Sequence, residues 1–272
     1  MIIARYFVYF MFYSFLGWVW ETFYCAVCDK HFSNRGFLFG PVGPIYGFCV
    51  LALQVLLGCT EKDGGGQMPV WELFLICAFG SAVIEYATSY YLEQRFHASW
   101  WDYSRMPLNL HGRICLPVAC GFGAGGVVIS RYVLPAFSHA GSSIHPLIYE
   151  ALAMALMGVL GADFALTEAS LNSLIERIDS IEKELTRRAD SAAATVAGTP
   201  QTIELKVRSL EGEVKTRASQ IASSLNRRQK AVMDRIRSFQ PIRSSRYQFH
   251  FADRLKDSIH ELRSRGREDK ES

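Results

Sequence analysis

Several apolar runs in the sequence are each long enough to cross a lipid bilayer. A membrane-crossing helix needs about 20 apolar residues, because the hydrocarbon core is about 30 Å thick and a helix rises about 1.5 Å per residue. Backbone polar groups have no water to bond within lipid, so such runs predict helices. We therefore expect an all-α fold whose first 169 residues form a polytopic membrane helix bundle. Its five transmembrane helices are predicted at residues 3–28, 43–59, 70–92, 114–136 and 144–169.

The charge of the chain changes where the last apolar run ends. Residues 1–169 carry eight Lys and Arg against eleven Asp and Glu, whereas residues 170–272 carry 21 against 15. A shift of this size in composition is typical of a domain boundary. We expect the second part to be a basic, soluble helical tail.

The tail has heptad-like spacing of apolar residues. They step by three and four through residues 171–185 and again through 203–214, with a break at 192–200 between them. This pattern predicts a coiled-coil-like helical hairpin, in which Arg217 and Ser224 enter the apolar seam.

The tail therefore divides into two predicted parts. The hairpin covers residues 170–240, and a basic amphipathic helix with a disordered end covers residues 241–272.

The orientation in the membrane follows from the Lys and Arg of the short loops, which favour the cytoplasmic side. With five spans, the loops at 29–41 and 93–113 share a side with the tail, and this side holds most of the cations. The pattern predicts a multi-pass membrane protein with a cytoplasmic C-terminus. Residues 112–122, which contain Pro117, fit either a re-entrant entry or the start of a regular helix.

Among the acidic residues inside the apolar runs, where a charge costs about 2.5–3.5 kcal/mol at the bilayer centre, Glu21 and Glu85 are the informative pair. Glu21 and Glu85 both fall roughly 6–9 Å to the cytoplasmic side of the midplane, counted at 1.5 Å per residue. Arg35 and Arg113 lie in the loops of that side, so each acid could pair with an arginine in one state and release it when a substrate or proton binds. Structural salt bridges and a substrate or ion pathway both explain this arrangement.

Polar residues near these acids complete the candidate site. The candidates for a substrate or ion pathway are Glu21, Arg35, Glu85, Ser89, Asp102, Asn109 and Arg113. A second set, rich in Gly and Pro, predicts an irregular backbone held against the membrane. Its members are Asn34, Gly36, Gly40, Pro41, Pro44, Tyr46, Gly47 and Trp101.

Several of these residues belong to multi-residue strings that recur in a known family. The strings are Tyr13-Ser14-x-x-Gly17-Trp18-x-x-Glu21, the glycine-rich run from Asn34 to Gly47, Glu85-x-x-x-Ser89, Trp101-Asp-Tyr-Ser104 and Asn109-Leu-x-Gly-Arg-Ile-Cys-Leu116. In this order they resemble the CmpB-type family of type IV ABC-transporter permeases, which are bacterial integral membrane proteins. Gly43 and His111 depart from residues that are common in the family, and neither change removes a charge. The resemblance covers about residues 6–165 and implies a transport component of a bacterial plasma membrane.

No phosphate-binding loop of the G-x-x-x-x-G-K-[ST] type occurs in the chain, so we expect ATP hydrolysis to belong to a separate ATPase subunit. Neither a catalytic triad nor metal-ligand spacing is present, and we expect no enzyme activity, cofactor, metal or nucleic-acid binding. The expected partners are membrane lipids and a second copy of the chain, because the glycine-rich fourth span and the tail heptads both favour a homodimer. Two alternatives are a membrane-anchored scaffold acting through its tail and a lipid-headgroup enzyme using Glu21 or Glu85 as base.

Overall fold

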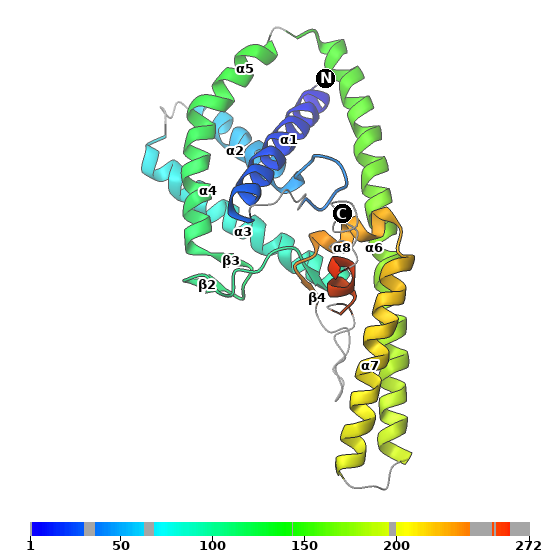
Figure 1. The fold of residues 1–272 in the computed structure, drawn as a ribbon. Coiled ribbons are helices and arrows are strands. Elements are labelled where there is room, and N and C mark those ends of the chain that lie inside the picture. Colours follow the sequence, from blue (N-terminus) through cyan, green and yellow to red (C-terminus); the bar gives the residue numbers. More distant parts are fainter. Residues whose placement is uncertain are drawn as a thin grey trace, which may run out of the picture. The chain divides into compact units, whose positions relative to one another are not determined.

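The computed structural model describes residues 2–29, 36–62, 68–142, 144–195, 200–239, 252 and 254–261. Apart from four two-residue strands and the connecting loops, these residues are helical, which confirms the predicted all-α fold (Figure 1). The helices are α1 (Ile2–Asp29), α2 (Pro44–Lys62), α3 (Val70–Phe96), α4 (Leu116–Val128), α5 (Leu134–Ser142), α6 (Pro146–Thr195), α7 (Pro200–Ser224) and α8 (Arg227–Arg235). A π-helical turn, η1 (Ile129–Val133), joins α4 to α5.

The strands form two short antiparallel pairs. β1 (Ala98–Ser99) pairs with β4 (Ser238–Phe239), and β2 (Asn109–Leu110) pairs with β3 (Ile114–Cys115). Residues 114 and 115 were predicted to open the fourth span, but they are strand, and the helix begins at Leu116 with a proline in its first turn. The chain therefore enters this span from a hairpin rather than from a longer helix.

Within the described residues, four helices are long and apolar enough to cross a membrane. They are α1, α3, the continuous helical run Leu116–Phe137 and the first part of α6. The apolar part of α2, Pro44–Cys59, is shorter and extends only about 24 Å. The protein is thus a multi-pass membrane protein, in which α2 is the shortest of the five predicted spans.

The chain divides into two compact units. The membrane unit comprises Met1–Leu92 and Trp100–Thr167, and the tail unit comprises Glu93–Ser99 and Glu168–Ser272. The backbone has no break at the boundary predicted near residue 169, because α6 continues as one helix of 50 residues into the tail unit.

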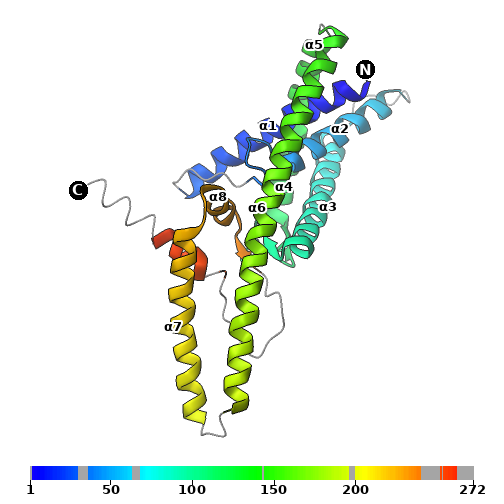
Figure 2. The same ribbon diagram turned by 90° about the vertical axis from the view of Figure 1, so that its right-hand side faces the viewer.

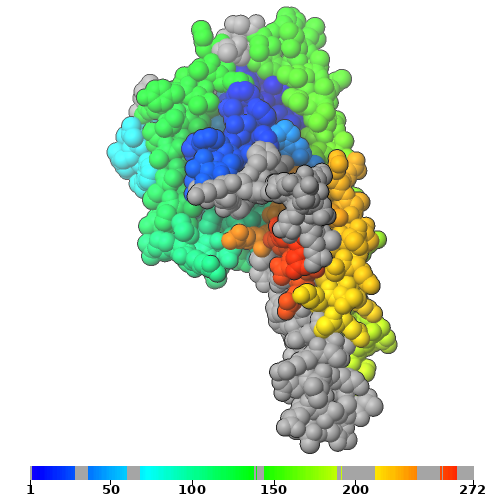
Figure 3. All heavy atoms as spheres, viewed as in Figure 1, coloured from blue at the N-terminus to red at the C-terminus, as the bar shows by residue number. Residues whose placement is uncertain are grey.

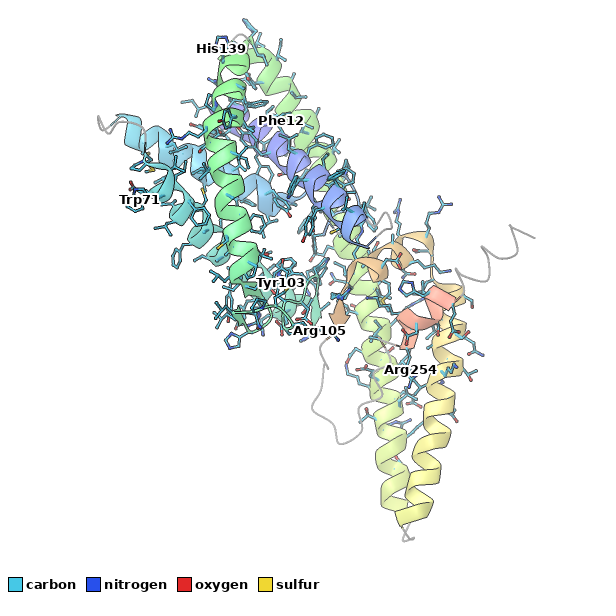
Figure 4. The ribbon with its side chains drawn as sticks, turned by 60° about the vertical axis from the view of Figure 1, so that its left-hand side comes forward. Phe12, Trp71, Tyr103, Arg105, His139 and Arg254 are labelled. Atoms are coloured by element: carbon cyan, nitrogen blue, oxygen red, sulfur yellow. The ribbon has the colours of Figure 1, made fainter. Side chains whose placement is uncertain are left out.

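Aromatic side chains of α1 build much of the core of the membrane unit. Tyr9 and Tyr13 are buried there, and the Tyr9 ring lies 4.9 Å from that of Phe137 on α5. Phe12 stacks on Phe137 with the ring centroids 4.2 Å apart (Figure 4). Atoms of α1 remain visible between those of α4 and α6 on one face (Figure 3). Trp71, at the start of α3, points away from the other helices of this unit (Figure 4).

Glycines let pairs of spans come into close contact. A Cβ atom at Gly126 would lie 2.4 Å from the sulfur of Cys77 on α3, and one at Gly123 would lie 2.9 Å from the ring of Phe74. Among the described residues, no other element lies within 4 Å of such an atom at Gly121 or Gly125. Half of the glycine-rich face that suggested a homodimer is therefore used within the chain to pack α4 against α3.

The second half of α6 and α7 run side by side in the tail unit (Figures 1 and 2). The predicted seam of α6 is buried at Leu171, Leu174, Ile178 and Leu185, while the side chains of Ile203, Val207 and Leu210 lie outside the described residues. On α7 the buried positions are Val214, Ala218 and Ala222, whereas Ser224 is exposed and Arg217 is half-buried. The prediction that Ser224 enters the seam is therefore wrong, while that for Arg217 stays a prediction.

The predicted hairpin also ends earlier than residue 240. Residues 225 and 226 interrupt the helix, and α8 follows as a separate short helix. Of the predicted segment 241–272, the described residues 254–261 are helical and bury Leu255 and Ile259. The disordered end predicted beyond them lies outside the described residues.

Candidate functional site

Glu85 is a buried carboxylate in the middle of a membrane-crossing helix. Its side chain on α3 is only 6% exposed, and it accepts a hydrogen bond of 3.1 Å from the Tyr103 hydroxyl. Burial raises the pKa of the Tyr103 phenol well above its ordinary value, and the nearby Glu85 charge raises it further. Tyr103 is therefore a neutral phenol, and its hydroxyl donates a hydrogen bond to the carboxylate.

Glu21 on α1 and Tyr46 on α2 form a second acid–tyrosine pair. The two side chains are hydrogen-bonded, and the Glu21 carboxylate is close enough to Glu85 for their charges to interact. The absence of a side chain at Gly17 makes room for Tyr46, because a Cβ atom there would lie 2.2 Å from the Tyr46 Cβ. We call Glu21, Tyr46, Glu85 and Tyr103 the acid–tyrosine cluster.

A folded loop between α3 and α4 holds Tyr103 in place (Figure 4). The backbone N–H of Tyr103 donates to the Gly112 carbonyl at 2.8 Å, and Asp102 accepts from the Ser104 N–H at 2.9 Å. Gly112 has a φ of 69°, and a Cβ atom there would lie 2.8 Å from an Asp102 oxygen. The position therefore favours glycine for both its backbone conformation and its space.

Asn109 closes the same loop through three hydrogen bonds to the backbone. Its amide nitrogen donates to the carbonyls of Ser104 and Met106 at 3.1 and 2.9 Å, and its oxygen accepts from the Gly112 N–H at 3.2 Å. Asp102 and Asn109 were predicted as pathway residues, and these contacts give both of them a role in shaping the loop that carries Tyr103.

Arg113 lies against aromatic residues of α3. Its guanidinium donates to the Tyr86 hydroxyl at 3.2 Å and lies 5.3 and 5.4 Å from the ring centroids of Tyr86 and Tyr90. The same Tyr86 hydroxyl is 3.2 Å from a ring nitrogen of His111. Arg113 thus contacts the helix that carries Glu85, through the residue next to it in sequence.

The remaining predicted site residues are placed as follows. Ser89 is buried one turn after Glu85 on α3, and the Trp101 indole donates to the Arg113 carbonyl at 2.9 Å. Arg35 and Asn34 lie outside the described residues, so the predicted pairing of Arg35 stays a prediction.

The loop of residues 36–43 is tied to α6 by an acid that sequence reasoning did not assign to the site. Asp163 accepts hydrogen bonds from the backbone N–H groups of Phe39 and Gly40 at 3.0 and 2.8 Å. A Cβ atom at Gly40 would lie 2.9 Å from an Asp163 oxygen. The sequence signal was an acid inside the fifth apolar run, but hydrogen bonds to backbone groups leave no side-chain pattern that could identify its contact.

The other motif glycines and prolines of this region bring α2 onto α1. Gly36 is buried, Pro41 is exposed and Pro44 begins α2. The Gly43 N–H donates to the Ser14 carbonyl at 2.9 Å, and a Cβ atom at Gly47 would lie 2.0 Å from the Ser14 hydroxyl oxygen.

Comparison with protein families gives one match. A family described as "putative ABC-transporter type IV", of the CmpB type, matches residues 8–168, which is more than half of the chain. The chain belongs to this family. No curated protein and no solved structure gives a match.

The CmpB-type match includes all four residues of the acid–tyrosine cluster and also Asp163. The match ends at Glu168, which is the first residue of α6 that belongs to the tail unit. The cluster therefore lies within the family region, whereas nearly all of the tail unit lies beyond it.

Proposed function

We propose that this protein is the membrane subunit of an ABC-type transporter and that its acid–tyrosine cluster binds a positively charged substrate. The observation that carries this proposal is that Glu21 and Glu85, on two different helices of an apolar bundle, are close enough for their charges to interact. Ionisable residues inside membrane spans mark substrate and ion pathways, because their cost must be balanced by a function.

The chemistry of the cluster favours a cation. Two carboxylates together attract a positive charge, and hydrogen bonds from neutral phenols position them without cancelling that charge. Tyr103 reaches Glu85 from a loop, and Tyr46 reaches Glu21 from the short helix α2. In this mechanism an entering cation replaces the phenol hydrogen bonds, and the loop carrying Tyr103 then moves away from α3.

The energy for transport comes from a second protein in this proposal. The sequence carries no phosphate-binding loop, so a separate ATPase subunit binds and hydrolyses ATP while this chain catalyses no reaction itself. The chain lies in a bacterial plasma membrane with its tail in the cytoplasm, as the distribution of Lys and Arg favours.

Transport of organic cations into membrane vesicles tests this function. Vesicles from cells that make the wild-type protein should accumulate at least one of a panel of radiolabelled organic cations when ATP is supplied, and vesicles from a deletion strain should not. The variant Glu85→Gln should lower this accumulation at least about tenfold, since it removes one of the two charges that bind the cation.

Glu72→Gln is the matched control. It makes the same change on α3, but about 20 Å away from Glu85 along the helix, and should transport normally. The proposal fails if no cation is accumulated in an ATP-dependent manner. It also fails if Glu85→Gln, present at the wild-type level in the membrane, transports as well as the wild type.

A homodimer would give the transporter a pathway lined by two copies of the bundle. A Cβ atom at Gly121 or Gly125 would meet no other element of the described residues within 4 Å, which leaves a face of α4 open to close approach by a second copy. Crosslinking in native membranes should therefore recover a dimer, and recovery of monomer alone would contradict it.

A further inference from the structure

The last turn of α3 and the part of α6 that follows its apolar run are joined by a salt bridge in the tail unit. The apolar part of α6 up to residue 166 is about 30 Å long, so Glu168 stands at the edge of the hydrocarbon. Arg95, in the last turn of α3, forms a salt bridge of 3.2 Å with Glu168. The pair therefore marks the membrane–water boundary on the side of the tail.

The segment from α8 to β4 is held close to this boundary at both ends. At its start, the Gln229 side chain donates to the Ser173 hydroxyl at 3.3 Å, and Ser173 is only about 7–8 Å beyond Glu168 along α6. At its end, β4 pairs with β1, which follows directly after α3, and the Arg237 N–H donates to the Ser99 carbonyl at 2.7 Å. The chain thus returns from the far end of the α6–α7 hairpin to the level of the headgroups.

The packing of α8 leaves the basic residues of its first turn outside the buried face. A capping box fixes the first turn, because the Asn226 side chain accepts from the Gln229 N–H and the Gln229 side chain accepts from the Asn226 N–H. The buried residues of the helix are Gln229, Val232, Met233 and, in its last turn, Arg235. Arg227 and Arg228 are consequently exposed and Lys230 is half-buried.

Within α8, no acidic residue of the first turn balances this charge. The first turn of α8 contains no acid, and the acidic residue of the helix, Asp234, is half-buried near its other end. Positive charge at the N-terminal end of a helix is also unfavourable by itself, because the helix dipole is positive there. Arg227, Arg228 and Lys230 therefore form an exposed cationic surface, which we call the α8 basic surface.

We propose that the α8 basic surface binds the headgroups of anionic phospholipids in the leaflet from which the tail emerges. The headgroup layer is roughly 5–7 Å thick on each side, and charges interact over about 8 Å at physiological salt, so Ser173 and the helix it holds lie within reach. A basic residue near an anionic membrane surface contributes about 1 kcal/mol, a factor of roughly five in binding. This contact anchors the tail unit on the membrane independently of what the bundle transports.

Hydrogen exchange of the full-length protein in lipid nanodiscs tests this proposal. The backbone amides of residues 227–235 should exchange at least about fivefold more slowly in discs that contain phosphatidylglycerol than in discs of phosphatidylcholine alone. The triple variant Arg227→Gln, Arg228→Gln and Lys230→Gln should lose this difference, and high salt should weaken it in the wild type.

A second triple variant, Arg187→Gln, Arg188→Gln and Lys215→Gln, removes the same charge from the far part of the hairpin. Arg188 lies about 30 Å beyond Glu168 along α6, so this variant should keep the full lipid effect. The proposal is overturned if phosphatidylglycerol does not slow the exchange of wild-type α8, or if both triple variants lose the effect equally. It is also overturned if soluble glycerophosphate slows exchange as much in phosphatidylcholine discs, because the ligand is then a free phosphate rather than a membrane surface.

Discussion

The membrane unit and the tail unit differ in whether they leave large apolar side chains exposed. Among the described residues, the exposed large apolar side chains run from Ile2 to Leu166 and all belong to the membrane unit. In the tail unit, apolar side chains such as Leu174, Met233 and Leu255 are fully buried. Lipid solvates an apolar surface as well as a protein interior does, whereas water does not.

This difference means that the two units are stabilised by different interactions. The tail unit depends on the hydrophobic effect along the α6–α7 seam. The membrane unit cannot use that force between its helices, and it relies on close contact at glycines and on polar contacts such as those of Asp163 and Tyr103. Substitutions that remove either kind of contact should therefore act on one unit and spare the other.

The largest effect is expected from a cavity in the tail unit. Leu174→Ala removes a side chain with no exposed surface and should destabilise the tail by about 2–5 kcal/mol. Chemical denaturation of the full chain in detergent, followed by hydrogen exchange in α7, measures this change. Leu75→Ala, at a position that is 55% exposed on α3, should leave both units nearly as stable as before. Equal losses in the two variants would break the contrast between the units.

A polar contact in the membrane unit should give the next largest effect. Asp163→Asn leaves a single carbonyl oxygen for two backbone donors and should cost about 1.5–3 kcal/mol, the usual value of hydrogen bonds to a charged group. The amides of Phe39 and Gly40 should then exchange faster. Glu168→Gln is the control, because its salt bridge with Arg95 is well exposed and should contribute little. Unchanged exchange at both amides in Asp163→Asn would contradict the anchoring role of Asp163.

Close helix contact can be tested with one added methyl group. Gly47→Ala places a Cβ atom 2.0 Å from the Ser14 oxygen and 2.7 Å from the Phe10 carbonyl oxygen, so α2 must move away from α1 at a cost of about 1–3 kcal/mol. Gly80→Ala adds the same group where nothing lies within 4 Å and should be neutral or slightly stabilising. Thermal unfolding in detergent compares the two variants, and similar midpoints would show that α1 and α2 are not in close contact.

The smallest effect is expected for a single hydroxyl group of the cluster. Tyr103→Phe removes the donor to Glu85 and should cost about 1 kcal/mol, with faster exchange in residues 100–115. Tyr91→Phe, at an exposed position on the same α3, serves as the control. If Tyr103→Phe matches the wild type in both stability and loop exchange, the contact between Tyr103 and Glu85 does not hold the loop.

Sequence reasoning succeeded where a local pattern reports directly on the surroundings of a residue. The apolar runs predicted the membrane helices, and the three-four spacing predicted the buried positions Leu171, Leu174 and Ile178. It failed at Ser224, because the buried positions of α7 include the small residues Ala218 and Ala222, which do not stand out in a heptad pattern. The start of α8 was missed although Asn226 and Gln229 carry the spacing of a capping box.

The candidate site shows the same division. The sequence by itself determined that Glu21 and Glu85 lie within membrane helices, because the length of an apolar run sets the depth of each residue in it. Only the tertiary structure decided which groups these acids contact. Tyr46 reaches Glu21 because Gly17 leaves space for it. Tyr103 reaches Glu85 from a loop between α3 and α4. The shape of that loop depends on contacts of Asp102, Asn109 and Gly112. Such contacts join residues far apart in the chain, and a helical or heptad period carries no information about them.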